Sequence, residues 1–250
     1  MPLDNNSNIA IIIPAKNEGQ TIGGVLDKIL LRFYPDNVIV IVDDMRDDSV
    51  IIAQQRKVRV LRNNKRGKGG AIRFAIDNVN SDILVFIDAD GSHDPEDIPK
   101  LIQPIIAGKA DLVIASRIKG GSEEFSGSIE NSVHYIGNRL SAFITNLFWN
   151  YEDYKITDCQ NGFRAIRNNT AIQLDLREDT SVIEQEMTIQ CLKKGFRIDE
   201  IPSYEFKRQY GKPRINAMNT LPRHILYFII SIFDVFKYLF SRNSSLQKLL

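Results

Sequence analysis

The sequence has few cysteines, no excess of charge of either sign and no long uninterrupted apolar run. Its two cysteines, Cys159 and Cys191, have no metal-ligand spacing and make no disulfide framework, so we expect a reducing, cytosolic setting. The net charge of +1 over 250 residues gives no bulk attraction to nucleic acid, and no nucleic-acid partner is expected. Residues 1–7 are polar and lack the positive flank of a signal peptide, so none is expected.

Two common phosphate-binding motifs are missing as well. The turn after the first apolar run lacks the G-x-G-x-x-G pattern, which argues against a dinucleotide-binding Rossmann site. The glycine-rich run 63–70 lacks the G-x-x-x-x-G-K-[ST] pattern, which argues against a Walker P-loop.

What the first 116 residues do contain is a regular alternation of short apolar runs and amphipathic segments. Strands are expected at 8–14, 38–42, 58–61, 83–90 and 111–116, with helices from about 21, 49, 71 and 94 between them. Asp94 is expected to cap the last of these helices, with Asp97 as its reciprocal partner. The alternation predicts a doubly wound α/β fold with a mostly parallel sheet and flanking helices.

After Arg117 the pattern is less regular. We expect a mobile loop over 119–127, a polar turn over 157–164, a helix over 181–194 closed by Gly195, and a strand over 196–201. An amphipathic helix is expected over 139–149, with Ser141, Thr145 and Asn146 opposite an apolar face. That apolar face consists of Leu140, Phe143, Ile144, Leu147 and Phe148.

The strand 83–90 ends in Asp88 and Asp90, which strand alternation would place on the same side. Ligands of open α/β sheets bind at the carboxyl ends of strands, and two carboxylates there suit Mg²⁺ or Mn²⁺ on a diphosphate. Without further context the pair could also cap the next helix or be solvated. Lys16-Asn17-Glu18, Asp43-Asp44 and Arg117 follow other predicted strands, so polar groups from four strand ends are expected at one rim.

Acids from three strands would repel one another there unless a cation lies among them. Basic side chains that could bind phosphates are Lys68, Arg117, Arg139, Arg208, Lys212 and Arg214. Each of them alone could equally be a solvated surface charge.

A set of short motifs then extends from about residue 9 to residue 214. They are Ile13-Pro14-Ala15-Lys16-Asn17-Glu18, Val42-Asp43-Asp44, Gly67-Lys68-Gly69 with Ala71, Asp88-Ala89-Asp90 with His93-Asp94-Pro95-Glu96, Ser116-Arg117 with Gly120-Gly121, Asp158 with Gly162-Phe163-Arg164, Glu186-Met187, and Arg208 with Gly211. In this ordered set the chain resembles the family 2 glycosyltransferases of the GT-A fold. Within them it is most similar to polyprenyl- and dolichyl-phosphate sugar synthases such as the dolichol-phosphate mannosyltransferases.

The resemblance implies roles for several of the matching residues. Asp88 and Asp90 would bind Mg²⁺ or Mn²⁺ on the diphosphate of a nucleotide-sugar donor, and Arg117 and Arg139 would hold the acceptor phosphate. The donor would contact Pro14, Ala15, Asn17, Glu18, Asp43, Asp44, Lys68, Asp88, Ala89, Asp90, Arg208 and Arg214. The residues expected to carry the reaction are Asp88, Asp90, Arg117, Asp158 and Arg208.

Three positions depart from the family's pattern. Asp-Asp-Gly-Ser appears here as Asp44-Met45-Arg46, which alters the loop at the nucleotide edge. The family often has a glutamine two residues beyond the metal aspartates. Ser92 stands at this position here, so a third protein ligand to the metal is in doubt. The closing G-x-S-K motif ends in Arg214 instead of lysine.

The resemblance implies an inverting, metal-dependent transfer of a hexose to dolichyl or polyprenyl phosphate. A phosphate acceptor is already ionised and needs no strong general base, whereas a glycan or protein hydroxyl does. Asp158 is the candidate base for the hydroxyl alternative, and it could equally orient Arg164 or cap its turn. A non-catalytic nucleotide-sugar-binding subunit is a further alternative. GDP-mannose, UDP-glucose and UDP-N-acetylhexosamine all remain open as donors.

The most apolar segment, 221–240, is interrupted by Arg223, His224, Asp234 and Lys237. Asp and Lys cost roughly 2.5–3.5 kcal/mol each at mid-bilayer, so we expect an interfacial or partner-docking helix. The predicted organisation is a catalytic domain over 1–218, with a membrane-interface helix at about 133–150, and a C-terminal apolar helix over 219–250. We expect a peripheral protein at the cytoplasmic face of a membrane, docked by these helices or by a membrane-anchoring partner subunit. For both helices the alternative is packing in the domain core.

Overall fold

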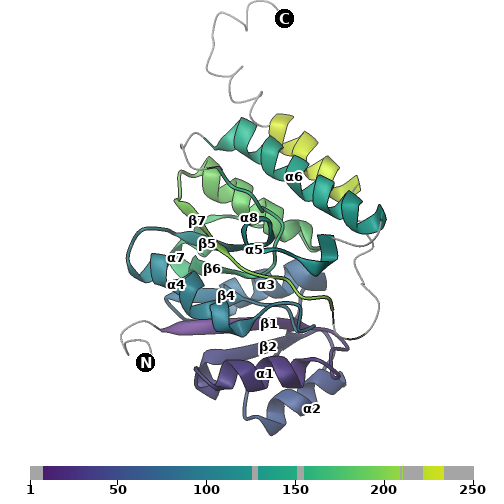
Figure 1. Ribbon diagram of the computed structural model, residues 1–250. Coiled ribbons are helices and arrows are strands. Elements are labelled where there is room, and N and C mark those ends of the chain that lie inside the picture. Colours follow the sequence, from purple (N-terminus) through teal and green to yellow (C-terminus); the bar gives the residue numbers. More distant parts are fainter. Residues whose placement is uncertain (1–7, 126–128, 151–154, 209, 211–221, 234–250) are drawn as a thin grey trace, which may run out of the picture. The chain divides into compact units, whose positions relative to one another are not determined.

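The computed structural model describes residues 8–125, 129–150, 155–208, 210 and 222–233. The chain divides into two compact units, residues 1–214 and residues 215–250. The first unit holds a seven-stranded sheet in the order β3-β2-β1-β4-β6-β5-β7 (Figure 1). The strands are Ile9–Ala15 (β1), Val38–Val42 (β2), Arg59–Arg62 (β3), Ile83–Phe86 (β4), Leu112–Ser116 (β5), Arg164–Arg167 (β6) and Ile198–Pro202 (β7).

The strands are parallel except β6, which is antiparallel to both β4 and β5. The helices are Ile22–Leu30 (α1), Asp48–Gln55 (α2), Gly67–Asn78 (α3), Ile98–Ile106 (α4), Arg117–Gly120 (α5), Ile129–Trp149 (α6), Asn168–Gln173 (α7) and Val182–Lys193 (α8). Side chains of α1, α2 and α4 pack on one face of the sheet, and those of α3, α7 and α8 pack on the other. The predicted α/β fold with a mostly parallel sheet and flanking helices is therefore confirmed.

The strand runs were predictable because β1, β2, β4 and β5 are buried almost completely and carry continuous branched or aromatic residues. Helix α4 buries the four residues at helical spacing that face the sheet, Ile98, Leu101, Ile102 and Ile105. Gly195, at φ +73°, follows α8 as the sequence indicated, because glycine adopts this left-handed conformation without strain.

Several local predictions need correction. Strand β4 ends at Phe86, so Asp88 and Asp90 lie in the turn beyond it and strand alternation does not orient them. Asp94 does cap a short 3₁₀ turn, but the carboxylate of Asp97 bonds to Ser203 and Lys100 and forms no reciprocal cap. Helix α3 begins at Gly67, so its first turn contains the glycine-rich run.

The regions after Arg117 hold more regular structure than expected. The predicted loop over 119–127 contains the end of α5 and a 3₁₀ turn at Glu123–Phe125, and residues 126–127 lie outside the described part. Strand β6 begins at the end of the predicted polar turn, and α7 follows it directly. The charged ends of β6 conceal it in the sequence, because Arg164 looks like a surface residue and yet is fully buried.

Helix α6 buries its polar face and exposes its apolar face, which is the reverse of a helix that packs on a hydrophobic core. Asn138, Ser141 and Thr145 are buried, and hydrogen bonds join the first two to Asp158 and Gln160. On the other side Leu140, Phe143 and Leu147 are 55%, 62% and 62% exposed. We call these three residues the apolar face of α6. The core alternative is therefore wrong for these three residues, while Ile144 and Phe148 are half-buried.

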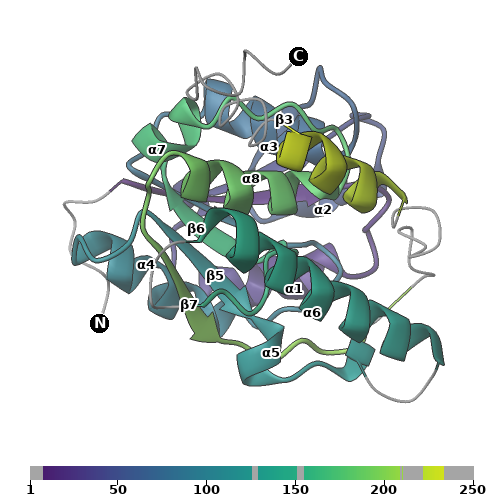
Figure 2. The same ribbon diagram turned by 90° about the horizontal axis from the view of Figure 1, so that it is seen from above.

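Helix α6 lies beside α8 (Figure 2). In the second unit, residues 222–233 are helical, within the predicted helix 221–240, and the remainder of that prediction lies outside the described residues. Within the part of the chain that the structure describes, no helix combines the length and the apolarity that crossing a bilayer requires.

Candidate functional site

The carboxyl ends of β1, β2, β4 and β5 lie at one edge of the sheet, because these strands all run in the same direction. Asn17 and Glu18 follow β1, Asp43 and Asp44 follow β2, Asp88 and Asp90 follow β4, and Arg117 follows β5. The structure thus places the predicted polar groups at a common rim, and it divides them into smaller ion-paired clusters.

The turn after β1 is held by the first turn of α2. The amide of Asn17 donates to the Asp47 carboxylate, and the amide of Glu18 donates to the Ser49 hydroxyl at 3.0 Å. Asn17 has φ +48°, a left-handed conformation that asparagine tolerates better than most residues. Asp47 also caps α2 through the amide of Ser49. Sequence reasoning missed Asp47 and Ser49, although an Asp two residues before a Ser at a helix start is a recognisable cap.

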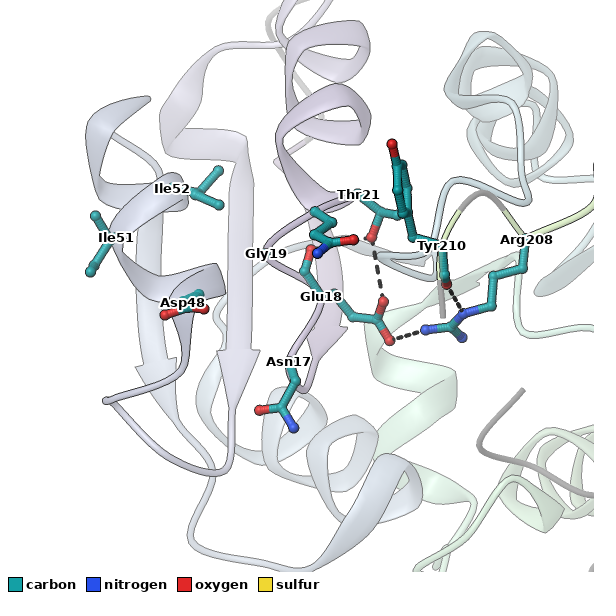
Figure 3. A pocket seen from close by; sticks show the side chains of 10 residues that line it. Asn17, Glu18, Gly19, Thr21, Asp48, Ile51, Ile52, Arg208 and Tyr210 are labelled. Carbon is teal, nitrogen blue, oxygen red and sulfur yellow. Dashed lines mark hydrogen bonds and ion pairs between the residues drawn. The ribbon is translucent and has the colours of Figure 1, made fainter. Parts of the chain in front are cut away.

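Arg208 joins the loops after β1 and β4. One guanidinium nitrogen lies 2.5 Å from Glu18 Oε1, and Nε donates to the Tyr210 carbonyl at 2.7 Å (Figure 3). Another guanidinium nitrogen lies 3.3 Å from Asp90 Oδ2. All three charged side chains are mostly buried. The structure therefore brings together three residues, Glu18, Asp90 and Arg208, that the sequence assigned separately to the donor.

An open pocket of about 640 Å³ lies beside this ion pair (Figure 3). Its lining consists of Asn17, Glu18, Gly19, Gln20, Thr21, Asp48, Ile51, Ile52, Arg208 and Tyr210. The apolar part of this lining, from α2 and Tyr210, was not predicted, because Ile51 and Ile52 look like ordinary helix residues in the sequence.

Asp43 and Asp44 do not line this pocket. Asp43 lies 3.9 Å from the Lys16 ammonium and accepts from Asn63 Nδ2 at 2.9 Å. Asp44 forms an exposed bidentate pair with Arg46, whose hydrogen bonds lower the pKa of that carboxyl to about 2. Arg46, which departs from the family's pattern, thus pairs with Asp44.

The small predicted donor residues contribute little side chain to the rim. Pro14 and Ala15 belong to β1, and the side chain of Ala15 packs in the core. Ala89 is also buried in the core, so its backbone is the part that could reach a ligand. Arg139 is exposed on α6, and Lys212 and Arg214 lie outside the described residues.

Asp88 belongs to a second cluster. The Lys68 ammonium lies 2.7 Å from Asp88 Oδ1 and 2.9 Å from Glu184 Oε1, and His93 Nε2 lies 3.8 Å from Asp88 Oδ2. Burial alone would raise the pKa of Asp88, but Lys68 and His93 bring it below its ordinary value. Burial would lower the pKa of Lys68, and its two acidic partners raise it instead. Glu184 is a site residue that the sequence did not identify, and His93 belongs to a matching motif but was given no role there.

Arg117 and Asp158 form a third cluster. Arg117 Nε and Nη2 donate to the two Asp158 oxygens at 2.7 and 3.0 Å, and Nη1 donates to Glu205 at 3.3 Å. Asp158 is fully buried and also accepts from Asn138 Nδ2 at 2.8 Å. Burial would raise the pKa of Asp158, but Arg117 lowers it to about 2.

Asp158 therefore caps its own turn and pairs with Arg117. The amides of Gln160 and Asn161 donate to its Oδ1 at 3.2 Å. One alternative role for Asp158 was to orient Arg164. Arg164 donates instead to the carbonyls of Asn161 and Glu184. The backbone carbonyls around α8 and the 159–161 turn therefore compensate the Arg164 charge.

The acids at the rim fit a divalent cation that takes most of its ligands from a bound phosphate. Within the described part of the chain, no group of three or more His, Cys, Asp or Glu side chains could enclose a metal by itself. Mg²⁺ sites with nucleotide substrates commonly use one or two carboxylates plus phosphate oxygens and water. Ser92, which replaces a possible third ligand, donates its hydroxyl to Asp90 Oδ1 at 2.7 Å and so orients that carboxylate.

Comparison with known proteins shows which family the chain resembles. Residues 10–174 match the sequence profile of the family described as "Glycosyl transferase family 2". The chain is 30% identical over 229 residues to the UDP-N-acetylglucosamine–dolichyl-phosphate N-acetylglucosaminyltransferase of Methanococcus voltae, across 82% of this chain and 88% of that protein. It is also 30% identical over 224 residues to the undecaprenyl-phosphate mannosyltransferase of Micrococcus luteus, across 84% and 88%.

The fold is shared with a solved structure. Glucosyl-3-phosphoglycerate synthase from Mycobacterium tuberculosis, in complex with Mn²⁺, UDP and glucosyl-3-phosphoglycerate, superposes with a TM-score of 0.70 and 20% sequence identity. The superposition covers 90% of this chain and 80% of that one. At this identity the likeness supports the α/β arrangement of the sheet and its helices.

Proposed function

The chain belongs to glycosyl transferase family 2, and on this basis we propose that it transfers a hexose from a nucleoside-diphosphate sugar to dolichyl or another polyprenyl phosphate. The two relatives described above carry names of this type, with N-acetylglucosamine in one and mannose in the other. The nature of the sugar and of the nucleotide base stays open between such donors.

The state of Asp158 is the observation that carries the choice of acceptor. Its carboxylate is fully buried, is bound by Nε and Nη2 of Arg117, and has a pKa of about 2. A general base works best when its pKa lies near the working pH and its oxygen reaches the acceptor. The pKa of Asp158 lies far below neutral pH, and its two oxygens already accept from Arg117 and Asn138. A phosphate acceptor needs no such base because it is already ionised.

The proposed reaction is a single displacement. A phosphate oxygen of the acceptor attacks the anomeric carbon, the bond from that carbon to the donor diphosphate breaks, and the electron pair leaves with the nucleoside diphosphate. An α-linked donor would thus give a β-linked product. Arg117 and Arg139 are proposed to hold the acceptor phosphate, and Arg208, Lys68 and Arg214 the donor diphosphate.

Asp88 and Asp90 are proposed to hold Mg²⁺ or Mn²⁺ at the donor diphosphate, and the ion would neutralise charge on the leaving group. Arg208 contacts Asp90 and Glu18, so it lies where the donor phosphates would meet these acids. Positive charge at this point stabilises the diphosphate as negative charge develops on it.

The apolar face of α6 supports action at a membrane surface. Three large apolar side chains are exposed on one side of this helix, while its polar side is buried against the 156–160 turn. A polyprenyl phosphate lies in a bilayer, and an amphipathic helix can lie in the interface beside it. The cytoplasmic face and a membrane-anchoring partner subunit are part of this proposal.

The test offers labelled GDP-mannose, UDP-glucose or UDP-N-acetylglucosamine with Mn²⁺ and dolichyl phosphate, and measures label in the lipid extract. We expect product from one donor, none after EDTA treatment, and none from Asp90→Asn. Lack of lipid-linked product from every donor would refute the proposal. Label on a glycan or protein hydroxyl would favour the alternative acceptor, and nucleotide binding without any transfer would indicate a non-catalytic subunit.

A further inference from the structure

Helix α8 carries a buried carboxylate that the proposed reaction does not use. Glu184 has a side chain only 1% exposed, and its Oε1 lies 2.9 Å from the Lys68 ammonium. Burying an unpaired carboxylate costs free energy, and the ion pair with Lys68 offsets that cost for Glu184. We propose that Glu184 is a positioning residue, which holds Lys68 so that the ammonium is shared with Asp88 and does not neutralise it alone. This inference rests on the proposed metal and donor site at Asp88.

The packing between α3 and α8 fixes both partners. The amide of Gly69 donates to the Asp179 carbonyl at 3.0 Å, which joins the first turn of α3 to the segment before α8. A Cβ at Gly67 or Gly69 would collide with the carbonyl oxygens of Asp179 and Glu178. These glycines therefore allow close docking of the two segments, and Lys68 between them reaches across to Glu184.

The backbone closes over the ion pair from another side. A Cβ at Gly162 would lie 2.6 Å from Lys68 Nζ, 3.0 Å from Asp88 Oδ2 and 3.4 Å from Glu184 Oε1. The three charged groups thus surround one small space, which stays open because residue 162 has no side chain. Arg164 fixes the remaining partner, since it donates to the main-chain carbonyl of Glu184 at 2.7 Å.

This arrangement determines how strongly Lys68 competes for Asp88. An ammonium shared between two carboxylates leaves part of the charge of each uncompensated. If Glu184 lost its charge, Asp88 would be the remaining acidic partner of Lys68, and a divalent cation would have to displace a tighter ion pair. Groups that orient a metal ligand from behind typically change metal affinity about 10–100-fold when replaced, and we expect a loss in that range.

The experiment measures Mn²⁺ binding by electron paramagnetic resonance with UDP or GDP present to supply phosphate oxygens, and with no sugar donor, acceptor or turnover. Glu184→Gln should weaken Mn²⁺ binding at least about tenfold, as outer-shell changes do. Glu186→Gln is the matched control, because Glu186 is a buried acid on the same helix that accepts from the Arg177 and Glu178 amides and does not contact Lys68. This control should bind Mn²⁺ as the wild type does.

Two further variants separate positioning from other roles. Glu184→Asp keeps the buried charge but shortens its reach to Lys68, and it should also weaken binding. In a Lys68→Met background, adding Glu184→Gln should change the dissociation constant less than about threefold, because the two residues act as one coupled unit.

Each of the other outcomes refutes the positioning role, the metal site or the proposed function. Wild-type affinity in Glu184→Gln or in Glu184→Asp would refute the positioning role, as would a full Glu184→Gln effect in the absence of Lys68. Failure of the wild type itself to bind Mn²⁺ would refute the proposed metal site and this inference with it. Because the assay needs no turnover, a protein that binds Mn²⁺ but makes no product would count against the proposed function alone.

Discussion

Replacing Asp158 by asparagine tests the central claim about the acceptor. Asparagine keeps the size of the side chain and an oxygen that can accept from Asn138, but it removes the charge that faces Arg117. Arg117 would keep Glu205 as a partner at 3.3 Å. We expect Asp158→Asn to lower the free energy of unfolding substantially and to leave turnover measurable.

The size of the stability loss follows from the pKa of Asp158. A carboxyl whose pKa is about 2 in the folded protein and 3.8 ordinarily contributes about 2.5 kcal/mol to the stability of the folded state at neutral pH. Breaking a buried pair by removing one partner costs about 3–5 kcal/mol, and Glu205 should reduce that here. A loss of about 3 kcal/mol is therefore expected at pH 7.

The pH dependence has a defined sign. The folded-state pKa is the lower one, so the contribution is complete above pH 4 or so and disappears as the pH falls toward about 2, with about half of it gone near pH 3. Urea unfolding of wild type and Asp158→Asn at pH 7, 4 and 3 measures this. Asp44→Asn is the control, since the pKa of Asp44 is also about 2 but its pair with Arg46 is exposed, and no measurable stability change is expected.

Two results would contradict this reasoning. A stability difference that stays constant from pH 7 to pH 3 would show that the Asp158 charge does not stabilise the fold. A folded Asp158→Asn protein whose kcat falls by about 10²–10⁴, the usual effect of losing a general base, would indicate that Asp158 deprotonates a hydroxyl acceptor.

Three other predictions concern the rim and the membrane. Gly162→Ala should fold normally but lose most of its turnover, because the new Cβ would lie 2.6 Å from Lys68 Nζ, which can shift away from Asp88; native unfolding with reduced product would confirm this, and unchanged kinetics would contradict it. Leu140→Gln, Phe143→Gln and Leu147→Gln together should leave the unfolding midpoint unchanged and abolish co-sedimentation with anionic vesicles, since these side chains are exposed; retained vesicle binding would reject an interfacial α6. EDTA should stop turnover without lowering the melting temperature, because basic side chains already neutralise the rim acids; a large drop in melting temperature would show that a metal supports the fold.

The parallel strands and the rim could be predicted because their signals are local. Apolar runs such as 38–42 mark buried strands directly, and parallel connection brings their carboxyl ends to one edge. The partners of the rim residues could not be predicted in the same way. Glu184 lies 96 residues beyond Asp88, and Glu205 lies 88 residues beyond Arg117, so no local pattern connects them.

Strand β6 and helix α6 show two further limits of local pattern. Arg164 looks like a surface residue in the sequence, yet it is fully buried, and the carbonyls of Asn161 and Glu184 accept hydrogen bonds from its guanidinium. The amphipathic pattern of α6 was evident, but the pattern alone does not tell which face is buried. In the structure the polar face is buried because the 156–160 turn supplies hydrogen-bonding partners such as Asp158 and Gln160.

The acids after β4 are paired with basic side chains of the protein itself. Carboxylates gathered at one rim need positive charge, and the expected source was a metal ion. In the structure Lys68 of α3 contacts Asp88, and Arg208 from the far end of the domain contacts Asp90. Each acid therefore has its own basic partner from a different part of the chain. A bound cation and diphosphate would have to exchange with these pairs, so the proposed donor binding would rearrange existing ion pairs instead of filling a site of unpaired acids.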